Sequence, residues 1–228
     1  MIALIGASGR SGRALAAALA ARGEPFLPVL RDAATWRALG FTQNARVADL
    51  TDAPALSAAL AGATRIVSCA HARHAPAILA AAPPGAAFVF MGSTRRFSRW
   101  PDAHGDGVRA GEAAFLASGR PGVMLHPTMI YGAQGEDNVQ RLAALMRRLP
   151  VLPLPGGGRS LVQPVHQEDV TAALLAALER AEALSGTLVI AGPAPLPYRD
   201  FCAAVARAAG LALLPVLPLP AAALMALA

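Results

Sequence analysis

The sequence contains no lysine, because all 20 basic residues among its 228 are arginine. A lysine general base, a Schiff-base lysine and a phosphate-loop lysine are therefore excluded. The arginines are scattered along the chain, and aromatic residues make up only 5% of it. A nucleic-acid binder typically carries a basic stripe with aromatic residues between the charges. We therefore expect no nucleic acid among the partners of this chain, despite its net charge of +6.

Cysteine is also scarce, with only Cys69 and Cys202, whose separation matches no metal-binding motif. We expect no metal site, and a buried free thiol at Cys69, which lies in an apolar run. A strand that begins at Ile2 leaves no room for a signal peptide, which favours a cytoplasmic location. Prolines interrupt the apolar segment 211–228, so a membrane span is not expected. Its last residues, 221–228, favour a helix; either the chain is truncated there, or this helix docks on the body or on a partner.

Short apolar runs and helix-like segments alternate along the chain, which predicts a parallel sheet with right-handed crossovers. The expected strands are 1–5, 26–30, 45–48, 65–70, 87–91, 123–125 and 187–190. The expected helices are 13–22, 35–39, 53–60, 75–82, 111–118, 138–148, 169–184 and 198–209. We therefore expect a single α/β domain over 1–228, a Rossmann-type doubly wound parallel sheet. A small C-terminal substrate lobe would comprise about 132–163 and 192–228, where the connections are longer.

Three glycines, Gly6, Gly9 and Gly12, lie between the first strand and the first helix. Glycine permits a tight turn, close approach of the backbone to a pyrophosphate, and close packing of helix on strand. The N-terminus of the helix then offers free N–H groups to the phosphates. The pattern predicts that the loop binds NAD or NADP, with contacts from Gly6, Ser8, Gly9, Arg10, Ser11 and Gly12.

The residues after the second strand bear on the choice between the two cofactors. Asp32 lies 20 residues after Gly12, where a carboxylate would hold the ribose 2′-hydroxyl of NAD. Arg31 beside it, together with Arg10 in the loop, would instead pair with the 2′-phosphate of NADP. Two arginines against one aspartate favour NADP, with NAD as the alternative. In the other interpretation, Arg31 is solvated and Asp32 only caps the next helix.

The GxxGxxG spacing resembles the short-chain dehydrogenase/reductase superfamily, above all its extended and atypical branches. These include NmrA-like proteins, nucleotide-sugar epimerases and relatives of the 39-kDa subunit of complex I. The segments "LHPTMIYG" at 125–132 and "LVQPVHQEDV" at 161–170 resemble motifs of the same branches, so the resemblance covers about residues 1–210.

The resemblance implies further contacts to the cofactor. Asp49 and Leu50 would contact the adenine, although Asp49 has the alternative role of capping a turn. Residues 68–71, including Ala70, would line the central groove, and Pro127 to Met129 would border the nicotinamide. In the second motif, Asp169 would cap a helix and His166 would make a buried structural contact.

The acid–base residues of the resembled enzymes are a Ser/Thr after the fifth strand and a Tyr-x-x-x-Lys pair on the next helix. Ser93 stands in the first place, but the pair falls on His104 and Val108. His104 is able to exchange a proton near neutral pH, and we name Ser93 and His104 as catalytic candidates. In the alternative interpretation, His104 is an ordinary loop histidine. Glu112 on the same helix is expected to be structural.

Three functions stay open on this basis. The first is an NAD(P)-dependent oxidoreductase or epimerase of the atypical short-chain type, acting on a small molecule such as a nucleotide-sugar. The phosphate of its substrate would be bound by Arg95, Arg96, Arg99 and Arg159. In the alternative interpretation, these arginines are solvated at the surface. The second is a non-catalytic NADP-binding sensor or assembly protein, which the absence of the Tyr–Lys pair favours. The third and weakest is a reductase at a membrane surface, contacted through the apolar tail.

Overall fold

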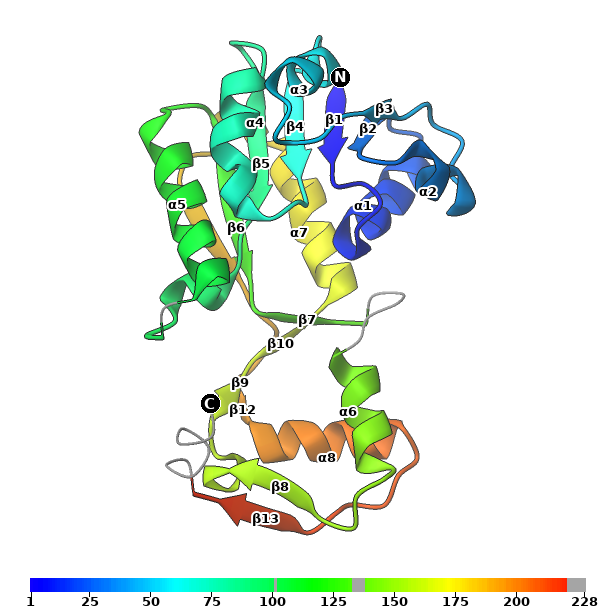
Figure 1. Cartoon of the computed structure of the whole chain (residues 1–228), viewed down its shortest axis with the longest axis vertical. Helices are drawn as coiled ribbons and strands as arrows, with labels where there is room; N and C mark the ends of the chain where they lie inside the picture. Colours follow the sequence, from blue (N-terminus) through cyan, green and yellow to red (C-terminus); the bar gives the residue numbers. More distant parts are fainter. Residues whose placement is uncertain (101, 133–137, 221–228) are drawn as a thin grey trace. The chain divides into compact units, whose positions relative to one another are not determined.

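The computed structural model describes residues 1–100, 102–132 and 138–220. The chain divides into two compact units (Figure 1). The first unit comprises Met1–Thr128 and Gln167–Ile190, and the second comprises the described residues of Met129–His166 and Ala191–Ala228. The two segments expected to form the substrate lobe, 132–163 and 192–228, fall within the second unit.

The first unit is built on one parallel sheet of seven strands, which confirms the predicted Rossmann-type fold class. In spatial order the strands are β11 (Thr187–Ile190), β6 (Gly122–Pro127), β5 (Ala87–Met91), β4 (Arg65–Ser68), β1 (Ile2–Ile5), β2 (Phe26–Leu30) and β3 (Arg46–Val47). Chain order reverses between β1 and β4, and ligands of open α/β sheets bind outside the carboxyl ends of strands at such a point.

Helices cover both faces of this sheet (Figure 1). The helices are α1 (Arg10–Ala21), α2 (Ala33–Ala38), α3 (Ala53–Leu60), α4 (Ala75–Ala81), α5 (Ala103–Ala117) and α7 (Gln167–Glu179). Helix α4 packs between α3 and α5 on one face, and α1 packs against α7 on the other. Short 3₁₀ turns stand at Ala72–His74 (η1), Thr94–Phe97 (η2) and Ala181–Ala183 (η4).

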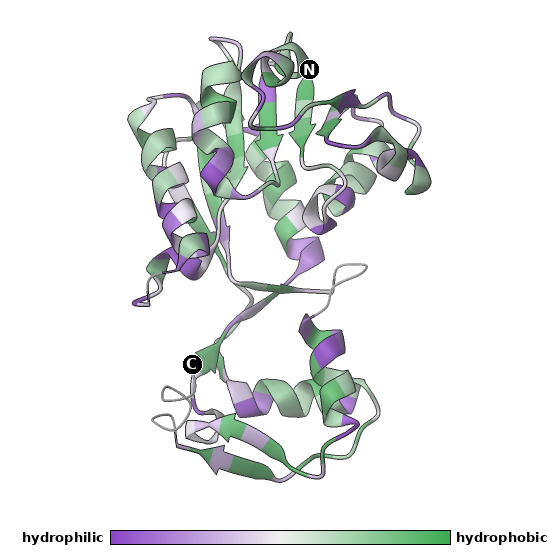
Figure 2. Ribbon diagram, in the orientation of Figure 1, coloured by the Kyte–Doolittle hydropathy of each residue, from purple (hydrophilic) through white to green (hydrophobic). Residues whose placement is uncertain are grey.

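The core of the first unit follows from the apolar strands, which Figure 2 shows as hydrophobic along the middle of the sheet. Every residue of β1 and of β6 is buried, as is typical of parallel strands covered on both faces. The side chains of Phe88 and Phe90 stack on β5, and Phe115 of α5 packs against Phe90. These contacts fix α5 against the strand that leads to Ser93.

The second unit is smaller and has its own apolar cluster, which includes Met146, Leu154 and Phe201. Its helices are α6 (Asn138–Met146) and α8 (Tyr198–Ala208), which pack on each other. Its strands pair two by two: β7 (Met129–Tyr131) with β10 (Pro164–His166), β9 (Leu161–Val162) with β12 (Leu196–Pro197), and β8 (Leu152–Pro155) with β13 (Val216–Leu219). A 3₁₀ turn at Gly156–Gly158 (η3) follows β8.

Helix α5 starts at Ala103, well before the predicted start at Gly111, so the loop interpretation of His104 is wrong. The carboxylate of Asp102 caps the helix and accepts hydrogen bonds from the N–H groups of His104 and Gly105. The glycines that suggested a loop are instead places of close packing. A Cβ on Gly111 would lie 2.0 Å from the carbonyl oxygen of Ala72, so only glycine lets α5 approach η1.

The strands β8 and β13 were not predicted, because their alternating prolines suggested irregular chain. Pro153 and Pro155 are exposed, whereas Leu152 and Leu154 between them are buried. Proline is tolerated in such a two-stranded edge pair because its missing N–H faces away from the partner strand. The helix predicted for 221–228 lies outside the described residues.

Two smaller expectations are corrected at α7 and β4. Helix α7 begins at Gln167, so Asp169 lies within the first turn and does not cap the helix. A carboxylate in this turn interacts favourably with the positive end of the helix dipole. The residue Cys69 is half-buried rather than fully buried, although burial raises the pKa of its thiol to about 12. The thiol is therefore protonated and unreactive at neutral pH.

Candidate functional site

A cavity of about 500 Å³ opens in the first unit at the carboxyl ends of strands β1, β2, β3 and β4. It lies at the edge of the sheet where chain order reverses. Seven of the residues that the sequence predicted to bind a cofactor line it: Gly6, Ser8, Gly9, Arg31, Asp49, Leu50 and Ala70. Its other lining residues are Ile5, Val29, Leu30, Ala48, Thr51, Cys69, His71 and His74.

The glycine loop that forms one wall depends on glycine for two different reasons. Gly6 has φ of +74°, a conformation that L side chains rarely adopt. A Cβ on Gly12 would lie 2.1 Å from the carbonyl oxygen of Gly6. Gly9 caps α1 with ordinary extended angles, and its Cβ would meet only this oxygen, at 3.2 Å. Gly9 is exposed, so its lack of a side chain leaves the loop surface open to a ligand.

Arg31 and Asp32 differ in their availability to a ligand. Asp32 caps α2 and accepts hydrogen bonds from the N–H groups of Ala34 and Thr35, at 2.8 and 3.2 Å, and from the Thr35 hydroxyl at 2.5 Å. These bonds lower the pKa of the Asp32 carboxyl and occupy both of its oxygens. Arg31 lines the cavity and makes no hydrogen bond or ion pair to any residue that the structure describes. Arg31 is therefore the cation that the cavity offers to an anionic ligand.

Asp49 closes a turn, as one of its two interpretations has it, and it also lines the cavity; its contact with the adenine stays a prediction. Its Oδ1 accepts hydrogen bonds from the N–H and the hydroxyl of Thr51, at 2.8 and 2.6 Å. These bonds and the nearby guanidinium of Arg31 lower the pKa of the Asp49 carboxyl. Burial lowers the pKa of His74 beside it, which favours a neutral imidazole in this wall. The pattern of the sequence had not singled out Thr51 or His74.

Five of the predicted cofactor residues lie outside the lining of this cavity. The hydroxyl of Ser11 points away to α7, where it donates a 2.8 Å hydrogen bond to Oε1 of Gln167. Gly12 packs beneath the loop, and Arg10 is exposed at the start of α1. The carbonyl oxygen of Pro127 accepts a 3.2 Å hydrogen bond from the Thr94 hydroxyl. Met129 begins β7 in the second unit.

Next to the cavity, His71 and His104 form a pair that the sequence did not predict. Their rings lie edge to face, 4.3 Å apart between centroids. Nδ1 of His71 accepts hydrogen bonds from the backbone N–H and the Nε of Arg73, at 3.0 and 3.1 Å, so its proton resides on Nε2. Burial lowers the pKa of His71 to about 4. His71 is therefore neutral at physiological pH, and His104 is the exposed member of the pair.

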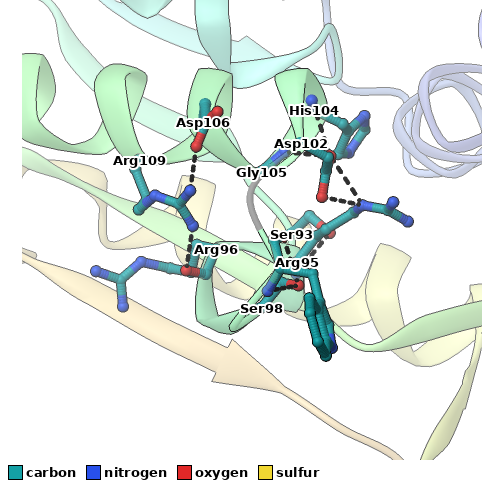
Figure 3. A network of polar contacts seen from close by, with 10 residues as sticks. Ser93, Arg95, Arg96, Ser98, Asp102, His104, Gly105, Asp106 and Arg109 are labelled. Carbon is teal, nitrogen blue, oxygen red and sulfur yellow. Dashed lines mark hydrogen bonds and ion pairs between the residues drawn. The ribbon is translucent and has the colours of Figure 1, made fainter. Parts of the chain in front are cut away.

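The two catalytic candidates belong to one polar network that joins β5 to α5 (Figure 3). The hydroxyl oxygen of Ser93 accepts a 3.2 Å hydrogen bond from the N–H of Arg95. The guanidinium of Arg95 pairs with Asp102 at 3.0 Å, and Asp102 caps the helix that carries His104. Val108, in the place of the lysine, is 1% exposed. The network therefore orders Ser93 and the first turn of the helix that carries His104. Val108 itself supplies no second proton-transfer group.

Behind Ser93 lies a buried charge cluster formed by Glu112, Arg96 and His126. The Glu112 carboxylate pairs with the guanidinium of Arg96, and its Oε2 lies 3.2 Å from Nε2 of His126. Nδ1 of His126 accepts a 3.2 Å hydrogen bond from the N–H of Ser93. Burial lowers the pKa of His126, partly offset by Glu112. Glu112 is thus structural, as expected, and the cluster holds the turn that carries Ser93.

The arginines proposed for a substrate phosphate belong to both units. Arg95 and Arg96 are engaged with Asp102 and Glu112. Arg99 is exposed after η2, and Arg159 is exposed after η3 in the second unit. Arg95 and Arg96 therefore serve the fold of the first unit.

Comparisons with known proteins agree with this architecture. No family model matches the chain. A protein of Mycobacterium tuberculosis strain H37Rv, "Uncharacterized protein Rv2047c", is 30% identical over 217 residues, which are 90% of this chain. A protein of Mycobacterium bovis, "Uncharacterized protein Mb2073c", matches to the same extent. The chain spans only 23% of the length of these curated relatives.

Similar solved structures include a short-chain dehydrogenase/reductase superfamily protein from Agrobacterium tumefaciens with bound NAD. Its TM-score is 0.77 at 19% identity, and the match covers 96% of this chain and 85% of that one. UDP-N-acetylglucosamine 4-epimerase from Bacillus cereus has a TM-score of 0.77 at 17% identity, with coverage of 95% and 84%. UDP-glucose 4-epimerase from Thermus thermophilus in complex with NAD has a TM-score of 0.72 at 19% identity, with coverage of 96% and 86%. The chain has the fold of these short-chain dehydrogenase/reductase and epimerase structures, as its sequence motifs implied.

Within the part of the chain that the structure describes, no helix has both the length and the apolar character needed to cross a bilayer.

Proposed function

We propose that the chain binds a nicotinamide dinucleotide in the cavity above the Gly6–Gly12 loop, with NADP preferred over NAD. The loop offers the bare backbone and the helix N-terminus that a pyrophosphate needs. The observation that carries the preference is the contrast between Arg31 and Asp32. Arg31 lines the cavity and has no hydrogen bond or ion pair to any described residue, whereas the carboxylate of Asp32 caps α2 with both of its oxygens. Neighbours of the same fold are crystallised with NAD, which supports the class of cofactor.

The activity we propose is that of an NAD(P)-dependent oxidoreductase or epimerase of the atypical short-chain type, acting on a small phosphate-bearing molecule such as a nucleotide-sugar. The nicotinamide, when bound, accepts or returns a hydride. His104 would take the hydroxyl proton of the substrate as a carbonyl forms, and would return it in the reverse direction. The Ser93 hydroxyl would orient the substrate oxygen. The exposed imidazole of His104 supports this assignment, because its ring packs edge to face on His71 and its backbone N–H donates to the helix cap Asp102.

A second candidate is a non-catalytic NADP-binding sensor or assembly protein. It is favoured by Val108, which fills the position of the usual lysine and is buried in the core. Because the chain contains no lysine, no register of α5 supplies the Tyr–Lys acid–base pair of the resembled enzymes.

A calorimetric titration with NADP⁺ and NAD⁺ tests the cofactor assignment, and we expect tighter binding of NADP⁺. Tighter binding of NAD⁺ would reverse the preference. Turnover is then sought with NADP⁺ and a panel of nucleotide-sugars, followed by the absorbance of the reduced nicotinamide. Epimerisation, which shows no net reduction, is followed by chromatography of the sugar. We expect His104→Ala to lower any turnover at least tenfold. Cofactor binding without turnover on any substrate would favour the sensor.

A further inference from the structure

We infer that His126 is the positioning residue of Ser93, and that Arg96 keeps His126 in the uncharged form that this role requires. All three residues belong to the first unit. The consequence for catalysis rests on the proposed function, in which the Ser93 hydroxyl orients the substrate oxygen. The contacts themselves are measurable without a substrate or a cofactor.

The imidazole of His126 is packed tightly against the segment that carries Ser93. His126 lies on β6 and is 1% exposed. A Cβ on Gly92 would collide with Nδ1 of the ring, so only glycine lets the backbone before Ser93 approach it. Nδ1 accepts a 3.2 Å hydrogen bond from the N–H of Ser93. The ring therefore fixes the backbone from which the Ser93 hydroxyl projects.

Two further hydrogen bonds tie the same turn to β6. The N–H of Gly92 donates to the carbonyl oxygen of Leu125 at 2.7 Å. The Thr94 hydroxyl donates to the carbonyl oxygen of Pro127 at 3.2 Å. Backbone carbonyls do not titrate, so of these three contacts only the one with His126 responds to a proton. The charge of this ring therefore decides whether the turn is held at all three points.

The hydrogen bond from Ser93 requires a neutral imidazole. Nδ1 of His126 accepts only while it carries no proton, so the proton of the neutral ring lies on Nε2. Nε2 is 3.2 Å from Oε2 of Glu112, so this proton is adjacent to a carboxylate oxygen. A second proton, on Nδ1, would meet the N–H of Ser93 donor to donor, and the hydrogen bond would be lost.

Arg96 supplies the charge that lets His126 stay neutral. Glu112 alone would favour a charged imidazole, because a carboxylate stabilises a cation beside it. Its Oε2 also pairs with Nε of Arg96. These buried atoms have no hydrogen-bond partner elsewhere in the described part of the chain, so the guanidinium balances the carboxylate. Burial lowers the pKa of His126, Glu112 opposes this effect, and Arg96 lowers the pKa further.

The segments around this imidazole are α5, η2 and the two strands beside β6. Helix α5 contributes Glu112, and η2 contributes Arg96 and the ring of Phe97, with 6.5 Å between the ring centroids. Gly92, which follows β5, and Val189 of β11 carry no charge. Among the described residues, the charges that act on the imidazole are therefore those of Glu112 and Arg96.

NMR spectroscopy on the ¹⁵N-labelled full chain tests the inference directly. At about pH 7 we expect a proton on Nε2 of His126, none on Nδ1, and a Ser93 amide protected from exchange with solvent. On acidification we expect the Ser93 amide resonance to shift with the same midpoint as the ring of His126. A proton on Nδ1 at about pH 7, or a Ser93 amide that does not follow the ring, would overturn the inference.

The variant Arg96→Gln tests the role of the guanidinium. We expect His126 to take up a proton in its place, so that the midpoint of the ring and of the Ser93 amide rises by about one pH unit or more. Arg99→Gln is the matched control, because Arg99 is an exposed arginine just after the same turn, and we expect it to leave the midpoint unchanged. An unchanged midpoint in Arg96→Gln would contradict the role of Arg96.

Two variants separate the contacts of the two ring nitrogens. His126→Asn keeps an acceptor near the position of Nδ1 but does not reach Glu112, whereas His126→Gln keeps a donor near Nε2 and loses the acceptor for Ser93. We expect stability in urea to fall in both. Protection of the Ser93 amide is expected to persist in His126→Asn and to fall about tenfold or more in His126→Gln.

Equal protection in the two variants, or the reverse order, would show that His126 acts only through packing and would overturn the inference. Neither ligand nor substrate enters these measurements. The expected NMR results in a chain without turnover would therefore count against the proposed enzyme and leave the positioning of Ser93 intact.

Discussion

The imidazoles of His71 and His104 lie edge to face with 4.3 Å between their centroids, and they join the wall of the cavity to the first turn of α5. A Cβ on Gly107, one turn further along α5, would lie 3.0 Å from Cε1 of His71. Glycine at this position therefore lets the helix approach the ring. The contact places the exposed His104 beside a histidine that stays neutral at physiological pH.

The first prediction concerns the effect of His71 on stability at low pH. An unfolded imidazole binds a proton near pH 6.5, whereas folded His71 does so only near pH 4. The unfolded state therefore binds more protons in this window, and the free energy of unfolding falls as the pH is lowered through it. Urea denaturation at about pH 7 and about pH 5 measures the loss.

The matched variant for this experiment is His71→Asn, whose carboxamide oxygen keeps an acceptor for the N–H of Arg73 but does not titrate. We expect the variant to lose less stability than the native chain over the same change of pH. Because His74 and His126 also have lowered pKa values, a part of the loss is retained. Equal losses in the two proteins would show that His71 does not titrate as the structure indicates.

The second prediction concerns the buried cluster behind Ser93. Glu112→Gln removes the charge that compensates Arg96, which is partly buried. Breaking a buried pair from one side costs about 3 kcal/mol, and we expect a destabilisation of that order in urea. Asp106→Asn breaks the exposed pair between Asp106 and Arg109 on the same helix and is expected to cost less than about 0.5 kcal/mol. Comparable costs in the two variants would mean that the cluster is not desolvated.

The third prediction separates two glycines of the loop. Gly12→Ala would place a Cβ against backbone at 2.1 Å, so we expect a loss of about 2 kcal/mol or more in stability. Gly9→Ala meets only a 3.2 Å contact and is expected to fold with nearly native stability. Its methyl group nevertheless lies on the exposed loop surface, where we expect it to weaken NADP⁺ at least tenfold. Native affinity in a folded Gly9→Ala protein would exclude the loop as the pyrophosphate site.

Periodicity predicted much of the sheet correctly because the strands are short, apolar and separated by turn residues. The bounds of β2, β5 and β11 agree with the predicted 26–30, 87–91 and 187–190. The start of α5 was missed because Gly105, Gly107 and Gly111 are unfavourable in an isolated helix. Tertiary packing overrides that preference, since each of these glycines faces a neighbour within about 3 Å of an added Cβ.

The candidate site was predictable to the extent that it depends on local backbone geometry. Gly6 and Arg31 directly follow the strands β1 and β2. The end of each apolar run in the sequence indicates where such a strand ends. The contact of His71 with His104 was not predictable, because it depends on how closely α5 approaches η1. The capping role of Asp32 was weighed as an alternative, and the structure shows both of its oxygens in use.

The most direct measurement for the central claim is a crystal structure of the full chain grown with NADP⁺. We expect the pyrophosphate over the N–H groups of the Gly6–Gly12 loop, the 2′-phosphate within hydrogen-bond distance of the Arg31 guanidinium, and the adenine against Asp49 and Leu50. A cofactor bound elsewhere, or a 2′-phosphate directed away from Arg31, would contradict the account.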